Sequence, residues 1–367
     1  MTLFRPCAAD RHVLRPNRRL CLGHWLELLQ RGRQRGDRGP MLSDQDYCLL
    51  EDGRILSLHG SDQSEEYLFG EVAFVPDVGG EYEFFGQRYV KPYQDHGQGR
   101  RATNRGTIRD PEALMRLPVG ELFVNKSVVN PQRVQEHFRS EDLLARSLSG
   151  QNSRMILNMI NWLENEVLGP GLREDLTYGL TGSLALAGSS KVKNPHDIDL
   201  VIRAGLPQVQ RITERLQDAS ERDVNLRVFE YGKSWRMRLR TPFGLLCPFL
   251  SVTGGLYPLG NFAFKALVDD DFEIVGTVVD ASKGGLTPSL LFVEAGDTVI
   301  LAVDPDLRCR GDFRDGDRGQ FRGTRVLAEW GGDEHDVLVI SDSRRVRNAT
   351  PPWPQYYETD NEAPCIA

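Results

Sequence analysis

The chain has 367 residues, of which 40% are hydrophobic and 26% are charged, and its formal net charge is -7. This composition is typical of a globular protein of two or three domains, and it excludes wholesale disorder and a surface coated with basic residues for nucleic acid. The six cysteines form no CxxC pair and no zinc-type spacing with histidine, so we expect reduced thiols in a cytoplasmic protein.

The N-terminal segment, residues 1–40, is rich in arginine and contains one amphipathic stretch, Leu20–Leu29. The stretch predicts a helix, and a solvated terminus is favoured over arginine contacts with nucleic-acid phosphates. The segment has no apolar run of the kind found in secretory signals. Because no run of about 18 apolar residues occurs in the chain, we expect no transmembrane helix and no membrane partner.

Residues 41–130 change to short alternating runs separated by turn residues, which predicts a β-rich module. The clearest signal is Asp52-Gly53 between the runs Tyr47–Glu51 and Arg54–Leu58, an arrangement typical of a β-hairpin. Further strands are expected at Glu71–Pro76 and Glu81–Tyr89.

The next two stretches differ in periodicity. Gln94–Asn104 has none, which predicts an exposed loop. Pro131–Leu168 is predicted to be helical, because its second half carries apolar residues at three- and four-residue spacing. Gly169-Pro170-Gly171 ends the pattern.

A strand, a Gly-Ser turn and a short helix are predicted in succession. Leu176–Leu180 is an apolar run, Gly182-Ser183 interrupts it, and the small residues Leu184–Gly188 suit one or two helical turns. Glycine allows backbone N–H groups to approach a ligand closely, Ser183 adds a hydroxyl, and the free N–H groups of a helix start favour an anion. The turn therefore predicts a nucleotide-binding site for a triphosphate.

Two carboxylates follow on one strand face. In Asp197–Ile202 the residues alternate, so Asp197 and Asp199 point to the same side. Adjacent like charges are costly unless a cation lies between them. Magnesium prefers oxygen ligands and is often held by one or two carboxylates together with substrate phosphates. The pair predicts a metal site for one or two Mg²⁺ ions.

Gly182, Ser183, Asp197 and Asp199 together resemble the Gly-Ser and Asp-x-Asp signature of the DNA polymerase β-like nucleotidyltransferase superfamily. The resemblance implies that Ser183 holds the triphosphate and that the aspartates hold catalytic magnesium. The runs Tyr67–Pro76 and Gly86–Pro92, with the Asp-Gly hairpin, are also similar to the N-terminal region of uncharacterised archaeal and bacterial proteins that carry a nucleotidyltransferase domain.

The remainder of this domain is predicted as one helix, Leu206–Ala219, and three strands, Val224–Tyr231, Ser234–Thr241 and Leu245–Val252. The second strand alternates Arg236, Arg238 and Arg240 with apolar residues, so the arginines are expected on one face. They would either neutralise phosphate charge or lie in solvent.

The superfamily uses a third carboxylate on a neighbouring strand, but Phe243–Leu250 offers only Cys247 or Pro248 there. Glu230 is the nearest candidate replacement as a catalytic residue, and Asp269–Asp271 are more distant. Lys191 and Lys193, in the loop before Asp197, are further nucleotide-binding candidates as contacts to pyrophosphate.

Residues 261–345 predict a small β-barrel, with the oligonucleotide-binding type as one candidate, because five short strands are separated by Gly, Pro and Asp clusters. Its arginines, with Phe313 and Phe321, could form a basic and aromatic surface for single-stranded nucleic acid, but interleaved aspartates cancel much of the charge, so a structural barrel or a self-association module is favoured. Residues 346–367 are proline-rich and read as a tail.

The predicted fold class is α/β (α+β): a polymerase β-like nucleotidyltransferase domain with a mixed sheet, at 131–260, between the β-rich module 41–130 and the barrel 261–345. The predicted function is magnesium-dependent transfer of a nucleoside monophosphate from an NTP such as ATP to an RNA, protein or small-molecule acceptor, with release of pyrophosphate. The alternative is a catalytically degenerate nucleotide- or RNA-binding protein on the same fold. The sequence leaves the acceptor, the base and the oligomeric state open.

Overall fold

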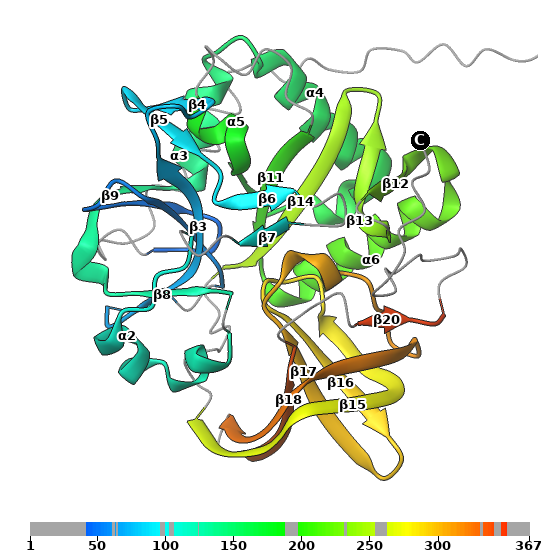
Figure 1. Ribbon diagram of the computed structural model, residues 1–367. Coiled ribbons are helices and arrows are strands. Elements are labelled where there is room, and N and C mark those ends of the chain that lie inside the picture. The colour runs from blue at the N-terminus through cyan, green and yellow to red at the C-terminus, as the bar shows by residue number, and fades with distance from the viewer. Residues whose placement is uncertain are drawn as a thin grey trace, which may run out of the picture. The chain divides into compact units, whose positions relative to one another are not determined.

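The computed structural model describes residues 42–60, 63, 65–95, 100–102, 106–123, 125–187, 197–230, 233–253, 263–330, 333–340 and 346–350 (Figure 1). The predicted helix at Leu20–Leu29 and most of the tail lie outside these residues. The described chain is a mixture of α and β structure in which strands predominate. None of its described helices is long and apolar enough to cross a membrane.

The first sheet has seven strands in the order β4-β5-β3-β2-β1-β9, with β8 paired to β3. Its strands are β1 (Tyr47–Leu50), β2 (Ile55–Leu58), β3 (Leu68–Pro76), β4 (Tyr82–Phe84), β5 (Gln87–Val90), β8 (Ser127–Val129) and β9 (Val134–Phe138). The predicted Asp-Gly hairpin is confirmed: β1 and β2 pair antiparallel, and Gly53 takes a φ of 80° in the turn. The helix α2 (Pro111–Arg116) and the 3₁₀ turn η1 (Pro118–Leu122) precede β8.

Two predictions for the β-rich module 41–130 are wrong. The single strand expected at Glu81–Tyr89 is the hairpin β4–β5, because Phe85 and Gly86 take φ values of 52° and 76° and turn the chain. The loop expected at Gln94–Asn104 contains a paired ribbon, β6 (Tyr93–Asp95) and β7 (Arg100–Ala102). The turn at Phe85 and Gly86 splits the first segment into two strands. In the second segment, pairing between two short polar stretches forms strands that periodicity does not reveal.

The helix predicted over Pro131–Leu168 is also partly wrong. The stretch starts with a 3₁₀ turn, η2 (Pro131–Arg133), and with β9, which pairs with β1 and so extends the first sheet to Phe138. Helices then follow as α3 (Ser140–Leu148), α4 (Ser153–Trp162) and the π-helical turn η3 (Leu163–Leu168). Gly169 ends them at a φ of 75°, as the sequence predicted, and a 3₁₀ turn, η4 (Pro170–Leu172), leads on. The open edge of β1 outweighs the weak helical pattern of Val134–Phe138.

The central sheet is mixed and has the order β10-β11-β14-β13-β12. Its strands are β10 (Thr177–Leu180), β11 (Asp197–Ala204), β12 (Arg227–Glu230), β13 (Lys233–Thr241) and β14 (Gly244–Val252). β11 and β14 run parallel, and the other neighbours are antiparallel. The helix α5 (Gly182–Ala187) follows β10, whereas α6 (Leu206–Arg222) and the 3₁₀ turn η5 (Val224–Leu226) connect β11 to β12.

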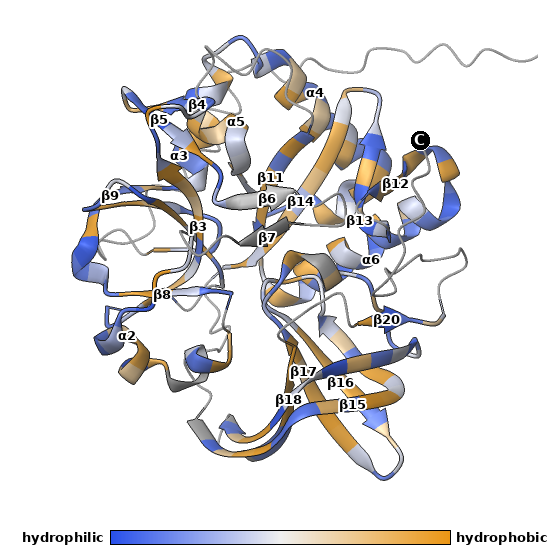
Figure 2. Ribbon diagram, viewed as in Figure 1, coloured by the Kyte–Doolittle hydropathy of each residue, from blue (hydrophilic) through white to orange (hydrophobic). Residues whose placement is uncertain are grey.

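The last sheet contains β15 (Ala263–Lys283), β16 (Ser289–Ala295), β17 (Thr298–Asp304), β18 (Arg318–Trp330), β19 (Asp333–Val339) and β20 (Arg347–Asn348). Its order is β15-β16-β17-β19-β18, and β18 pairs again with β15, so these five strands form a ring that encloses an apolar cluster. Apolar and polar residues alternate along its strands in Figure 2. The 3₁₀ turn η6 (Leu307–Cys309) lies between β17 and β18. We call residues 263–340 the C-terminal ring.

Candidate active site

The two aspartates of the predicted metal site lie at the start of β11. In the parallel pairing with β14, Asp197 stands opposite Leu245 and Asp199 stands opposite Cys247. Residues that pair across neighbouring strands share a sheet face. Asp197, Asp199 and Cys247 are therefore on the same face, as the alternation of the sequence predicted for the two carboxylates.

Gly182 brings the Gly-Ser turn directly against Asp199. Its φ is 73°, and a Cβ atom at this position would lie 1.9 Å from Oδ2 of Asp199. Only glycine fits, because the backbone is left-handed and the carboxylate occupies the space of a side chain. The structure thus places the predicted Gly182 at the predicted Asp199, and Ser183 follows as a half-buried residue of α5.

Tyr47 of the first sheet occupies part of the turn. The backbone N–H of Gly182 donates to its hydroxyl oxygen at 2.8 Å, and the hydroxyl of Thr181 donates to the same oxygen at 3.1 Å. Burial raises the pKa of Tyr47 to about 12, so its hydroxyl stays neutral. One N–H group that the sequence assigned to a triphosphate is therefore already bonded.

Asp199 has a strongly perturbed acidity. Burial, and next the negative charge of Asp197, raise the pKa of its carboxyl to about 7. Arg238 and Lys91 oppose the rise. A divalent cation bound beside Asp199 and Asp197 would offset the negative charge that opposes ionisation of Asp199.

Glu230 lies near the aspartates but does not complete a carboxylate triad. Arg238, a buried residue of β13, donates to Oδ2 of Asp197 at 2.9 Å and to Oε2 of Glu230 at 2.5 Å. Its guanidinium therefore separates the two acids. The prediction that Glu230 is the third carboxylate is not supported, and its partner is Arg238.

The neighbouring-strand position that holds a carboxylate in the family pattern is occupied by Cys247. Burial raises the pKa of this thiol to about 12, although Arg238 and Arg310 favour its ionised form. A neutral thiol is a weak ligand for magnesium and a poor base near neutral pH. Among the described residues no group of three His, Cys, Asp or Glu side chains is suited to hold a metal ion.

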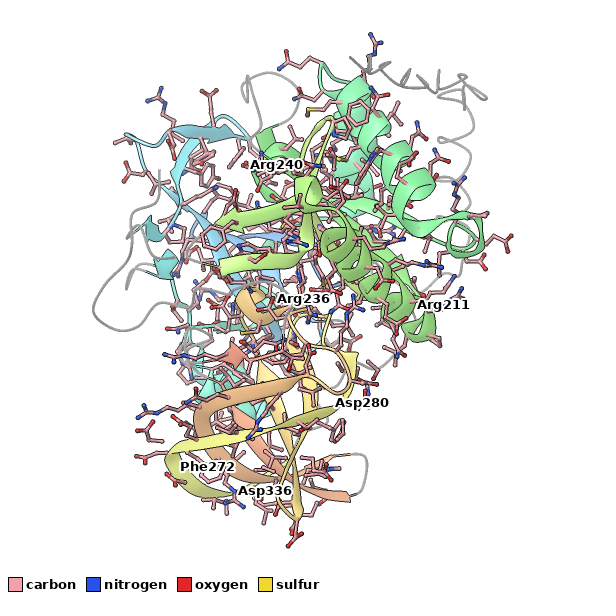
Figure 3. All side chains as sticks on the ribbon, turned by 90° about the vertical axis from the view of Figure 1, so that its right-hand side faces the viewer. Arg211, Arg236, Arg240, Phe272, Asp280 and Asp336 are labelled. Carbon is pink, nitrogen blue, oxygen red and sulfur yellow. The ribbon has the colours of Figure 1, made fainter. Side chains whose placement is uncertain are left out.

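Two of the three arginines of β13 share one face, as predicted, and this is the face of the aspartates: Arg238 binds Asp197, and Arg240 pairs with Leu245, which stands opposite Asp197. Arg236 binds Glu221 of α6 and Asp317 of the C-terminal ring, whereas Arg238 binds at the candidate site. The exposed Arg240 has no ion pair among the described residues, and Figure 3 shows it at a different position along the strand from Arg236. A bulge in β13 between Trp235 and Leu239 interrupts the alternation near Arg236, since Arg227 pairs with Leu239 while the next residue pairs with Trp235.

The aromatic surface considered for the ring does not form. Phe313 and Phe321 are 2% and 0% exposed, and their ring centroids are 5.0 Å apart inside the ring. Arg314 pairs with Asp218 and Glu221 of α6. Because buried rings cannot stack on bases, these residues do not form a platform for single-stranded nucleic acid.

The sequence missed three site residues that come from other sheets. Tyr47 starts β1, Lys91 directly follows β5 of the same sheet, and Arg310 follows η6 of the C-terminal ring. Each lies more than 50 residues from Gly182 or Asp199 in the chain, and no local pattern marks them. Lys191 and Lys193, which the sequence did single out, lie outside the described residues.

Asp197 and Asp199 fit one magnesium ion held together with substrate oxygens. The chain supplies two carboxylates on one face, and burial together with the charge of Asp197 raises the pKa of Asp199, an effect that a bound cation would oppose. Magnesium commonly takes one or two carboxylates plus phosphates and water. A second magnesium ion is disfavoured, because Arg238 already pairs with Asp197 and the residue opposite Asp199 is the thiol Cys247.

No family model, curated protein or solved structure matches this chain.

Proposed function

We propose that the protein is a magnesium-dependent nucleotidyltransferase with a polymerase β-like catalytic domain. The observation that carries the proposal is the contact of Gly182 with the carboxylate of Asp199, on the same face as Asp197. A triphosphate near the Gly-Ser turn would then lie beside the two carboxylates. Magnesium, when bound, would polarise the α-phosphate and neutralise the leaving pyrophosphate.

The chain's own residues would position this reaction. Ser183, on α5, would contact the triphosphate, and Asp197 and Asp199 would hold the cation. The positive charges of Lys91 and Arg238, which already act on Asp199, would favour a phosphate nearby. The reaction is the transfer of a nucleoside monophosphate to an acceptor with release of pyrophosphate.

The test is pyrophosphate release from each of the four NTPs in the presence of Mg²⁺ and a panel of RNA, protein and metabolite acceptors. We expect Asp197→Ala and Asp199→Ala to reduce release by about 10²- to 10³-fold or more, as is typical for the loss of a group that stabilises transition-state charge. Asp297→Ala, on an exposed turn of the C-terminal ring, is the matched control. Full turnover by both site variants would show that the proposal is wrong.

A second candidate is a catalytically degenerate protein that binds a nucleotide or RNA. The thiol of Cys247 at the neighbouring-strand position favours it, because turnover on this fold normally uses three carboxylates. The strand order of the C-terminal ring is that of an oligonucleotide-binding barrel, which supports the RNA part of this reading. Saturable binding of NTP without pyrophosphate release for any acceptor would favour this candidate.

A further inference from the structure

Arg310 is a buried cation with no ion pair among the described residues, although the charges of Asp44 and Asp199 act on it at longer range. Its side chain is 4% exposed, and its Nε and Nη1 atoms have no hydrogen bond. Nη2 lies 3.9 Å from Sγ of Cys247, and the guanidinium lies 4.2 Å from the ring centroid of Phe249. A buried charge is costly unless it is paired, so two free donor atoms on a buried guanidinium point to a missing anion.

The guanidinium lies on the face of the central sheet that carries the two aspartates. Cys247 pairs with Asp199, and Phe249 pairs with Val201 one step further along the same face. Leu307, from the turn η6 just before Arg310, packs against the cluster of Val201, Cys247 and Phe249. The C-terminal ring therefore delivers Arg310 to the β14 side of Asp199.

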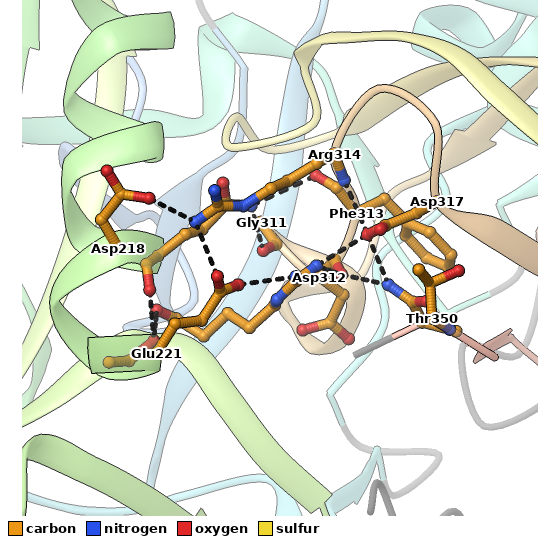
Figure 4. Close-up of polar contacts among 12 residues, drawn as sticks. Asp218, Glu221, Gly311, Asp312, Phe313, Arg314, Asp317 and Thr350 are labelled. Atoms are coloured by element: carbon orange, nitrogen blue, oxygen red, sulfur yellow. Dashed lines mark hydrogen bonds and ion pairs between the residues drawn. The ribbon is translucent and has the colours of Figure 1, made fainter. Parts of the chain in front are cut away.

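The segment that carries Arg310 is held firmly against α6. The amide of Gln217 donates to the backbone oxygens of Gly311 at 2.7 Å and Phe313 at 3.2 Å. Figure 4 shows Arg314 of the same segment reaching Asp218 and Glu221. These contacts hold the backbone next to Arg310 in a defined position. The guanidinium is therefore placed at Cys247 by the fold, with two donor atoms that form no hydrogen bond.

The two sides of Asp199 differ in the chemistry they offer. Gly182 and Ser183 lie on the side of β10, where the proposed function places the triphosphate. Cys247 and Arg310 lie on the side of β14. In nucleotidyl transfer the attacking and leaving oxygens stand in line on opposite sides of the α-phosphorus. The acceptor would thus approach from the side of Arg310.

An acceptor hydroxyl at this position would lack a base. The third carboxylate is replaced by Cys247, and Glu230 is held by Arg238. A nucleophile that is already ionised needs no proton removed, whereas a hydroxyl normally relies on a general base.

We propose that Arg310 binds an oxyanion of the acceptor, either a phosphate or a carboxylate, and that this oxyanion is the nucleophile. The inference rests on the proposed function and names its acceptor class. A lone pair of the oxyanion forms a bond to the α-phosphorus of the NTP, and the bond from that phosphorus to the bridging oxygen breaks. Pyrophosphate leaves with the electron pair, and no proton is transferred. The product is a phosphoanhydride from a phosphate, or an acyl nucleotide from a carboxylate.

The experiment compares three acceptors with the full chain, NTP and Mg²⁺. Transfer of the nucleoside monophosphate to ³²P-labelled inorganic phosphate is read as label in the β-position of the NDP. Transfer to acetate is read as hydroxamate after trapping with hydroxylamine, and glycerol serves as the neutral hydroxyl acceptor. We expect product from phosphate or acetate and none from glycerol.

Arg310→Met, Arg310→Lys and Arg314→Met make the test specific. We expect Arg310→Met to lower kcat/KM for the oxyanion by about 10²- to 10³-fold, and Arg310→Lys to lose less because it keeps the charge. Arg310→Met should melt no lower than the wild type, because the change removes an unpaired buried charge and keeps apolar contact with Phe249. Arg314→Met, on the same segment, should melt lower and keep the acceptor preference.

Each outcome decides the inference. Transfer to phosphate or acetate that depends on Arg310 supports it. Transfer to glycerol alone, or an Arg310→Met variant that uses the oxyanion as well as the wild type, overturns it and leaves the proposed function standing. No release of pyrophosphate with any acceptor overturns both.

Discussion

Cys247 illustrates how one side chain sets the chemistry of a site. A carboxylate at this position would add a third ligand beside Asp199 and would pair with the guanidinium of Arg310. The thiol present is neutral, since burial raises its pKa to about 12. The site is left with two carboxylates and, on the side of β14, the guanidinium of Arg310, which forms no ion pair among the described residues. That balance favours an anionic acceptor over a second metal ion.

Asp304, at the end of β17, is a buried acid with a raised pKa. Burial, and next the charge of Asp306, raise its pKa to about 7. Because this value lies above that of the unfolded chain, 3.8, the folded state binds more protons between about pH 4 and pH 7. The contribution of Asp304 to the free energy of unfolding therefore falls as the pH rises through this window.

We predict that Asp304→Asn removes this slope and makes the protein more stable than the wild type above pH 7. The amide keeps an oxygen that can accept the backbone N–H of Asp306, a bond that is 2.8 Å long in the wild type. The measurement is urea unfolding at pH values from 4 to 8, with Asp297→Asn as the control on an exposed turn. Equal slopes in wild type and Asp304→Asn would contradict the prediction.

At the scale of elements, the first sheet is fastened to the central sheet by one arginine at the end of β11. Arg203 is 6% exposed and donates to Oδ1 of Asp46 at 2.9 Å and to Oε1 of Glu141 at 2.6 Å. It also donates to the hydroxyls of Ser140 and Ser251 at 2.9 Å. The strand that starts with Asp197 and Asp199 thus ends in the contacts that position β1 and its Tyr47.

We predict that Arg203→Met lowers the free energy of unfolding by about 3–5 kcal/mol, because it removes the guanidinium that faces the buried Asp46 and the half-buried Glu141. Arg240→Met, on the exposed part of β13, should change it by less than about 0.5 kcal/mol. Both values come from urea denaturation followed by circular dichroism. The prediction does not hold if the two variants unfold at the same urea concentration.

At the scale of the whole described chain, buried ion pairs also join the central sheet to the C-terminal ring. Lys233 at the start of β13 pairs with Asp312, and both side chains are almost fully buried. Arg236 adds Asp317 at 2.8 Å and the backbone oxygen of Asp312 at 2.6 Å. The same segment carries Arg310 to the candidate site. The ring is therefore a part of the site's construction, and its position depends on charge pairing.

We predict that Lys233→Met lowers the free energy of unfolding by about 3–5 kcal/mol, since it removes the cation that faces the buried carboxylate of Asp312. The double variant Lys233→Met, Asp312→Leu should lose less than Lys233→Met, because replacing both partners of a buried pair by apolar residues is often neutral. A double-mutant cycle by urea denaturation measures both values. A double variant less stable than Lys233→Met would contradict this account.

The sequence by itself determined the local features of this protein. Alternation placed Asp197 and Asp199 on one face, the apolar runs located β10, β11, β13 and β14, and Gly182 marked the turn that meets Asp199. These features depend on neighbours in the chain, for which period and turn chemistry are sufficient. Where a local pattern was weak, pairing with another strand decided, as at β9, which the sequence assigned to a helix.

Tertiary structure alone decided which distant groups complete the site. It placed Tyr47 on Gly182, Arg238 between Asp197 and Glu230, and Arg310 beside Cys247. It also buried Phe313 and Phe321, which composition had suggested as a binding surface. The physical reason is that burial and charge pairing are set by contacts between sheets, so the acidity of Asp199 and the unpaired state of Arg310 exist only in the folded chain.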